Sequence, residues 1–195
     1  MLDGYTFTLA SASPRRRELL KGLDIAFTVE PGKDEKEAYS EGMPHTEIPA
    51  FLARHKSETF HRELRENEVL ITADTLVFLD EKILGKPKDP EDAAAMLRAL
   101  SGRTHTVVTG MALRTRERIH TFSDTTEVDF KLLSEEEIGY YIERYRPFDK
   151  AGAYGIQEWI GFVGITAIRG SYFNVMGLPV QRLYTELRRF LTQYE

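Results

Sequence analysis

One run of eleven residues constrains the fold of this chain more than any other part of its sequence. Val69–Leu79 is strongly strand-like, and it is apolar on both faces near each of its ends. A strand with two apolar faces belongs in the interior of a sheet that is covered on both sides. The run therefore predicts a central strand of a sheet flanked by helices.

The other predicted elements alternate between strands and helices early in the chain, and long antiparallel strands follow. Strands are expected at 5–10, 25–29, 82–84, 105–113, 119–130, 159–168 and 172–175. Helices are expected from 14 to about 20, where Gly22 ends the helix, and from about 47 to 64. Further helices are expected from the opening at Asp89–Asp92 to Leu100, after the capping box at Ser134, and from 180 to 190. This order predicts an α/β fold with a mixed, twisted sheet, built as one domain over residues 1–195 or as two closely joined lobes.

The composition excludes several classes of function. The chain has 195 residues, no cysteine and a formal net charge of −5. Disulfides, zinc–thiolate sites and thiol catalysis are therefore excluded, and a broad nucleic-acid-binding surface is not expected. No run approaches the ~18 to 20 apolar residues of a membrane span, and the first residues do not form a signal peptide. We expect a soluble, cytoplasmic protein.

The segment Leu9–Leu20 joins a strand end, a turn of small residues and a helix start. Ser13 is a good N-cap, so the first helical turn holds Arg15, Arg16 and Arg17. Cations are unfavourable at the positive end of a helix dipole, which indicates an anion nearby. Ser11 and its small neighbours would let a phosphate approach the backbone, and Arg15 and Arg16 are expected to lean over the sheet end. The alternative is a basic surface turn neutralised by acids.

Asp74 lies in the middle of the predicted central strand. A buried carboxylate must be paired, bound to a metal or placed where the strand opens into a cleft. It could also be structural, accepting hydrogen bonds from the backbone. Lys56, at the border of the apolar stripe of its helix, could reach such a cleft or simply cover apolar surface. Lys86 follows the tight turn after the strand and is expected to return toward Asp74.

Two acids and an amide complete the candidate site. Asp34 and Glu35 follow the second predicted strand, where solvated loop acids are the ordinary interpretation. Gln157 ends the run Asp149–Gln157, in which Lys150 stands among small residues, and its amide could read the edge of a base. A glycine-rich turn explains that run equally well. Cations together with carboxylates favour phosphoryl chemistry helped by a divalent metal.

Six segments in order along the chain resemble the signatures of the Maf family of nucleotide pyrophosphatases. They are Ser11–Leu20, Ala73–Val77, Gly85–Pro87, Met96–Gly102, Asp149–Gln157 and Asn174–Pro179. The resemblance implies a metal-dependent cytosolic enzyme that cleaves a nucleoside triphosphate between its α and β phosphates, with Mg²⁺ or Mn²⁺ as cofactor. It also implies two lobes around a cleft, a fold related to inosine triphosphate pyrophosphatases, and a homodimer.

The same resemblance implies roles for individual residues. Asp74 would be the catalytic proton acceptor and a metal ligand, and Glu35, or else Asp34, would be the second metal carboxylate. Substrate choice would depend on Arg15, Thr75 and Gln157, and the phosphates would be held by Ser11, Arg16, Lys56 and Lys86. The form of the segment that ends at Gln157 resembles the branch acting on dTTP and UTP rather than the branch preferring 7-methyl-GTP. Glu158 departs from the glycine that often follows this glutamine in relatives.

Other functions remain open from the sequence. A non-enzymatic nucleotide sensor or regulator of cell division could use the same basic loop, although a pure binder gains nothing from an acid beside phosphates. A phosphatase acting on another phosphate ester would release orthophosphate instead of pyrophosphate. His105, alone in a predicted strand, is expected to be a hydrogen-bonded structural residue.

Overall fold

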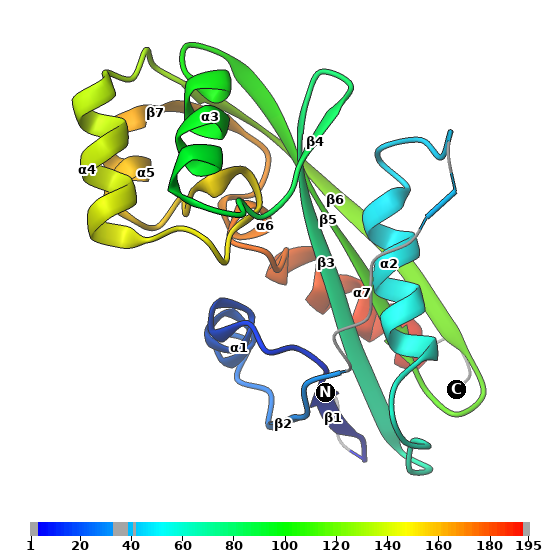
Figure 1. Cartoon of the computed structure of the whole chain (residues 1–195). Helices are drawn as coiled ribbons and strands as arrows, with labels where there is room; N and C mark the ends of the chain where they lie inside the picture. Colours follow the sequence, from blue (N-terminus) through cyan, green and yellow to red (C-terminus); the bar gives the residue numbers. More distant parts are fainter. Residues whose placement is uncertain (1–3, 33–38, 41, 193–195) are drawn as a thin grey trace. The chain divides into compact units, whose positions relative to one another are not determined.

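The computed structural model describes residues 4–32, 39, 40 and 42–192 (Figure 1). Its central element is β3 (Glu68–Leu79), which is buried along almost its whole length. The sheet has seven strands in the order β2-β1-β3-β5-β6-β7, with β4 paired to β3. The predicted central strand and the α/β class with a mixed sheet are confirmed.

Parallel pairing lies on one side of the first half of β3. β1 (Thr6–Leu9) pairs in parallel with β2 (Phe27–Val29) on one side and with β3 on the other, so that Phe7 lies opposite Val69. β4 (Lys82–Leu84) returns antiparallel along the end of β3, as the predicted hairpin requires. The long strands β5 (Thr104–Arg114) and β6 (Ile119–Phe130) are neighbours, and β7 (Ile165–Arg169) pairs antiparallel with β6.

The chain divides into two compact units. The first comprises 1–74, 109–124 and 177–195, and the second comprises 75–108 and 125–176. The residues of β3, β5 and β6 are shared between the two.

Alternation along the strands sorts the first unit into two faces. Phe7, Val69 and Ile71 contribute to a core with α1 (Pro14–Lys21) and α7 (Val180–Thr192). Residues at the alternate positions face the other side, where α2 (Ile48–Glu58) runs beside the strands (Figure 1). Gly110 of β5 permits this contact, because a Cβ there would lie 2.0 Å from the carbonyl carbon of Pro49. The two faces are therefore covered as the sequence predicts.

The second unit has its own apolar core. α3 (Pro90–Leu100) and α4 (Glu135–Tyr145) lie side by side and pack with Leu79, Phe130 and Ile160 (Figure 1). Asp89 caps α3 by accepting a hydrogen bond from the Asp92 amide, and the capping box at Ser134 opens α4 as expected. Its remaining helices are η1 (Ala151–Ala153), α5 (Trp159–Gly164) and α6 (Tyr172–Val175).

One predicted strand is wrong, and another is correct only in its second half. The run predicted as a strand over 159–168 is α5 followed by β7, and the strand predicted over 172–175 is α6. Ile160 is fully buried, and a Cβ on Gly161 would lie 1.8 Å from the Ile156 carbonyl oxygen, so the helix packs directly on the preceding turn. Ser171 caps α6 by accepting from the Asn174 amide. Tertiary packing overrides the β-propensity of these residues.

The second predicted helix is also too long. α2 ends at Glu58, and Thr59 closes it through a bond from its amide to the His55 carbonyl. Phe60 and Leu64 lie beyond the helix, where they pack with Leu70 at the start of β3. Phe51 of α2 is 39% exposed.

Gly22 is the C-cap of α1, as predicted. Gly22 ends the helix with right-handed dihedral angles, and the left-handed residue is Asp24, with a φ of 54°. Among the described residues, no helix is long and apolar enough to cross a membrane.

Candidate functional site

α2 places Lys56 against Asp74 of β3. The Lys56 Nζ donates a hydrogen bond to the Asp74 Oδ1, and the Asp74 side chain is only 6% exposed. One helical turn earlier, the Thr72 hydroxyl donates to the Ala53 carbonyl oxygen at 2.6 Å. Because a turn of helix and two residues of strand advance by similar lengths, this bond places Lys56 beside Asp74 on the same face. The lysine therefore compensates the charge of a buried carboxylate.

The basic start of α1 contacts the backbone of β3 next to Asp74. The Arg16 Nη1 donates to the Ala73 carbonyl oxygen at 2.9 Å, and its Nε donates to the Gly177 carbonyl oxygen at 2.8 Å. Arg16 thus ties the first helix to the backbone beside Asp74 and to the segment that precedes α7. Arg15 is half-buried and Arg17 is exposed, as the predicted helix orientation requires.

The turn before α1 is built from side-chain hydrogen bonds. Ser11 is buried and accepts a bond from the Ser13 amide at 3.2 Å, and Ser13 in turn caps the helix by accepting from the Arg16 amide. The first turn of the helix contains no acidic residue. The structure therefore brings Ser11, Arg16, Lys56 and Asp74 onto adjoining elements of the first unit.

Three further predicted site residues, Thr75, Lys86 and Gln157, belong to the second unit. Thr75 follows Asp74 on β3 and is half-buried, whereas Lys86 follows β4 and is exposed. Gln157 is half-buried, and its Oε1 is buried with no hydrogen-bond partner among the described residues. Glu35 and its alternative Asp34 lie outside the described residues.

The Lys150 segment folds as a compact turn. The Gly152 amide donates to the Gly85 carbonyl oxygen at 3.0 Å, and Gly152 has a φ of 70°. A Cβ on Gly152 would lie 3.1 Å from a methyl group of Val77. The glycine is therefore needed both for its left-handed conformation and for its close approach to β3.

The Maf-like protein family matches residues 6–190, which is nearly the whole chain. The chain belongs to the Maf family. Similar proteins over nearly their full lengths include three that are each named dTTP/UTP pyrophosphatase. The relative from Porphyromonas gingivalis is 52% identical over 97% of this chain and 98% of its own. The relatives from Bacteroides thetaiotaomicron and Flavobacterium johnsoniae are 49% and 48% identical, covering 96% and 95% of this chain and 97% and 95% of theirs.

Among solved structures, a HAM1 protein from Coxiella burnetii is similar over 95% of this chain and 99% of its own, with a TM-score of 0.49 and 17% identity. The expected relation of this Maf-family chain to inosine triphosphate pyrophosphatases stays a prediction.

A divalent metal, as expected from the resemblance, needs carboxylate or imidazole side chains of this Maf-family chain to hold it. Among the described residues, no three His, Asp or Glu side chains gather closely enough to form a metal site. Mg²⁺, however, is commonly held by one or two carboxylates together with substrate phosphates. The buried carboxylate of Asp74 suits a metal that arrives with a triphosphate, and it is the described residue that would hold it.

An ion cluster at the start of β3 was not predicted from the sequence. Glu68 is 2% exposed and accepts two bonds from Arg62, at 2.7 and 2.9 Å, and one from the Thr8 hydroxyl at 2.6 Å. Arg62 also binds Glu30 through two bonds at 2.7 and 2.9 Å. The hydrogen bonds from Arg62 lower the pKa of Glu68 to about 2. No local pattern identifies this cluster, because its members come from four separate segments.

The hydrogen-bond partner of His105 was not predicted from the sequence either. The His105 Nε2 and the Tyr154 hydroxyl are 2.7 Å apart, and both residues are buried. Burial lowers the pKa of His105 to about 4 and raises that of Tyr154. His105 is therefore a buried, neutral, hydrogen-bonded residue, as expected.

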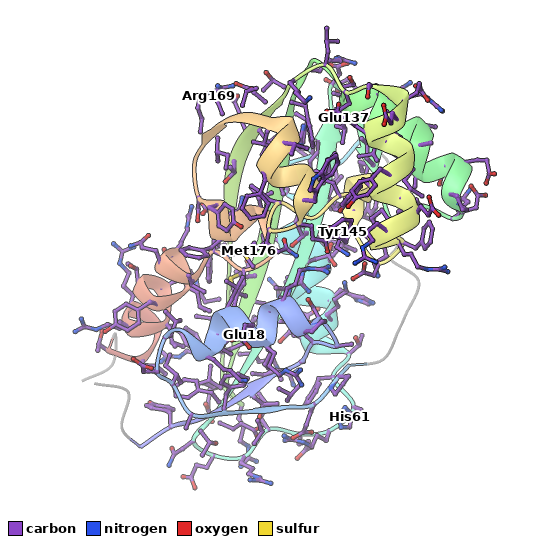
Figure 2. All side chains as sticks on the ribbon, turned by 90° about the vertical axis from the view of Figure 1, so that its left-hand side faces the viewer. Glu18, His61, Glu137, Tyr145, Arg169 and Met176 are labelled. Carbon is purple, nitrogen blue, oxygen red and sulfur yellow. The ribbon has the colours of Figure 1, made fainter. Side chains whose placement is uncertain are left out.

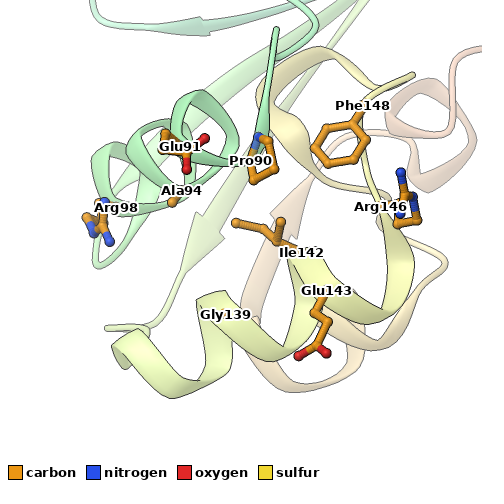
Figure 3. Close-up of a pocket in the computed structure, with 9 residues that line it drawn as sticks. All are labelled: Pro90, Glu91, Ala94, Arg98, Gly139, Ile142, Glu143, Arg146 and Phe148. Carbon is orange, nitrogen blue, oxygen red and sulfur yellow. The ribbon is translucent and has the colours of Figure 1, made fainter.

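The pocket in Figure 3 lies between α3 and α4 and has a volume of about 530 Å³. Pro90 and Ile142 face it from the two helices, and Phe148 closes one end. None of the predicted site residues lines it.

Proposed function

We propose that this chain hydrolyses dTTP and UTP to the nucleoside monophosphate and pyrophosphate, as a nucleoside triphosphate diphosphatase. The observation that carries the proposal is the identity of about half of all residues, over nearly the whole chain, with relatives named dTTP/UTP pyrophosphatase. The buried Asp74 carboxylate supports it, because a protein that only binds triphosphates has no use for a negative charge beside them.

In the proposed mechanism, a carboxylate oxygen of Asp74 accepts a proton from the attacking water. The water oxygen forms a bond to the α-phosphorus, and the bond from that phosphorus to the α–β bridging oxygen breaks. Pyrophosphate leaves with the electron pair of that bond. A divalent cation bound with the triphosphate supplies neutralisation of phosphate charge.

The basic residues have separate parts in this proposal. Lys56 orients the Asp74 carboxylate through their hydrogen bond and is also proposed to contact the phosphates. Arg16 has two of its donors on backbone carbonyls, so it holds the α1 turn in place as well as adding positive charge near the phosphates. Ser11 and Lys86 complete the phosphate contacts, and Arg15, Thr75 and Gln157 govern substrate choice. Glu35, or else Asp34, provides the second metal carboxylate.

Three further properties belong to the proposal. A homodimer is supported by the large apolar side chains Leu132 and Phe162, which are 80% and 81% exposed. Mg²⁺ or Mn²⁺ is the proposed cofactor, and the cytoplasm, where nucleoside triphosphates are made and used, is the proposed location. Light scattering after gel filtration measures the oligomeric state, and a monomeric mass would contradict the dimer.

The deciding assay measures pyrophosphate and orthophosphate release from dTTP, UTP, CTP, ATP, GTP and 7-methyl-GTP, with and without EDTA. We expect pyrophosphate from dTTP and UTP, and loss of activity with EDTA. Orthophosphate as the first product would favour a phosphatase, and preference for 7-methyl-GTP would favour the other branch. Nucleotide binding without turnover would favour a non-enzymatic regulator of cell division.

Asp74→Asn tests the catalytic base. Loss of a general base lowers the rate by about 10² to 10⁴, so the variant should bind UTP and lose most of its turnover. The control is Asp80→Asn, which changes an exposed aspartate beyond the end of the same strand. Turnover by Asp74→Asn equal to that of the control would refute the assignment.

A further inference from the structure

Gln157 sits on a closed turn of the second unit. The Glu158 amide donates to the Gly155 carbonyl oxygen at 3.0 Å, which closes the turn around Ile156 and Gln157. Ile156 is 5% exposed and packs in the core of the second unit. The buried Gln157 Oε1 has no partner among the described residues, so the turn presents an unused acceptor. A buried acceptor without a donor is costly, and a ligand can supply that donor.

One tyrosine hydroxyl ties both ends of this turn together. The Tyr141 hydroxyl accepts a hydrogen bond from the Gly155 amide at 2.9 Å and donates one to the Glu158 carboxylate. The other Glu158 oxygen lies 3.0 Å from the Nζ of Lys150, whose side chain is 8% exposed. Lys150 also donates to Asp149 at 2.8 Å. Burial and the neighbouring Glu158 raise the pKa of Tyr141, which keeps its hydroxyl protonated as the donor.

Close backbone packing supports the same turn from both sides. A Cβ on Gly155 would lie 3.0 Å from the Glu158 Cδ and 3.0 Å from the Lys150 Cε. A Cβ on Gly161 would lie 1.8 Å from the Ile156 carbonyl oxygen. The network and the helix α5 therefore leave the backbone of Gln157 little freedom to shift.

We propose that Tyr141, Glu158 and Lys150 are positioning residues that hold the Gln157 amide in place to distinguish uracil and thymine from cytosine. The inference rests on the proposed function and deepens it. Uracil and thymine present an N3–H donor and an O4 acceptor, whereas cytosine presents an N3 acceptor and an N4 amino donor. A glutamine amide held with its oxygen toward N3 accepts a hydrogen bond from the N3–H of uracil or thymine. In cytosine the same oxygen would face the N3 acceptor, and no hydrogen bond would form. A loosely held amide adapts to either pattern, since each glutamine offers both a donor and an acceptor.

The test compares kcat/KM for UTP and CTP in the full-length chain. Tyr141→Phe removes the hydroxyl and keeps the ring, so the UTP-to-CTP ratio should fall about tenfold, as expected when a hydrogen-bonded specificity contact of 1.4 kcal/mol is lost. The matched control is Tyr145→Phe, one turn along α4 (Tyr145 is labelled in Figure 2). The Tyr145 ring stacks on the Tyr141 ring at 5.2 Å between centroids. The UTP-to-CTP ratio of this control should stay at the wild-type value.

A double-variant cycle separates positioning from general loss of structure. In the Gln157→Leu background the specificity contact is absent, so Tyr141→Phe should leave the UTP-to-CTP ratio unchanged. A merely structural defect lowers both rates equally and does not move the ratio in either background. Glu158→Gln, which keeps the size of the side chain, is the second variant and should also lower the ratio. It decides the question if Tyr141→Phe does not fold.

The outcomes distinguish the inference from the proposed function. If wild type releases no pyrophosphate from any nucleotide, the proposed function fails and the inference fails with it. If wild type prefers UTP over CTP and folded Tyr141→Phe and Glu158→Gln keep the full preference, the inference alone fails. An equal fall in the ratio with and without Gln157 would also overturn it.

Discussion

Replacing Glu68 by Gln should destabilise the protein in a manner that depends on pH. Glu68 is buried at the start of β3, where Arg62, Thr8 and the Arg65 amide all donate to its carboxylate. The glutamine keeps the shape of the side chain and removes its charge. The variant therefore isolates the contribution of an ionised Glu68 to the free energy of unfolding.

The magnitude follows from the difference in pKa between the folded and unfolded states. The pKa of Glu68 falls from 4.5 to about 2 on folding, chiefly through the hydrogen bonds from Arg62. Since a tenfold change in proton affinity corresponds to about 1.4 kcal/mol, ionised Glu68 stabilises the folded state by about 3 kcal/mol at neutral pH. Because the folded-state pKa is lowered, this stabilisation is complete above pH 4.5 and is lost as the pH falls toward 2. About 1.4 kcal/mol of it is lost by pH 3.5.

Urea denaturation of wild type and Glu68→Gln at pH 7 and pH 3.5 measures both quantities. The free energy of unfolding of the variant should be lower by up to about 3 kcal/mol at pH 7, and the gap should narrow by about 1.4 kcal/mol at pH 3.5. The control Glu66→Gln, two residues earlier and exposed, should change stability by less than about 0.5 kcal/mol at either pH. A gap for Glu68→Gln that is equal at the two pH values would refute the argument from ionisation.

Two further predictions concern the contact between α2 and the sheet. Lys56→Met removes the countercharge that Nζ gives Asp74 and should lower the free energy of unfolding by about 3 kcal/mol in urea, and adding Asp74→Asn should restore part of that loss. No recovery in the double variant would contradict the charge argument. Gly110→Ala should lower the free energy of unfolding by at least about 1 to 3 kcal/mol, because its Cβ would lie 2.0 Å from the Pro49 carbonyl carbon. Gly139→Ala, where a Cβ meets nothing within 4 Å, is its control, and an equal melting temperature for the two variants would contradict the packing argument.

Local signals in the sequence determined much of the fold. The apolar run around Asp74 defined the central strand, Ser13 and Asp89 marked helix starts by their capping bonds, and Ser134 did the same for α4. These features depend on residues within a few positions of each other, so their physical causes are visible in one segment of sequence. The sequence left Asp74 as paired, metal-bound, cleft-facing or structural, because an acid inside such a strand needs compensation, and the structure shows a pairing with Lys56.

Only the tertiary structure decided which distant residues meet. It gave Asp74 the Lys56 ammonium as its partner, placed the Arg16 guanidinium on the backbone carbonyl of Ala73, and joined Glu68 to Arg62. It also turned the segment after Gln157 into the helix α5, against the β-propensity of its residues, because Gly161 packs on the Ile156 carbonyl. Such contacts form only when elements far apart in sequence pack together and bury the surfaces between them. No pattern within a single segment contains that information.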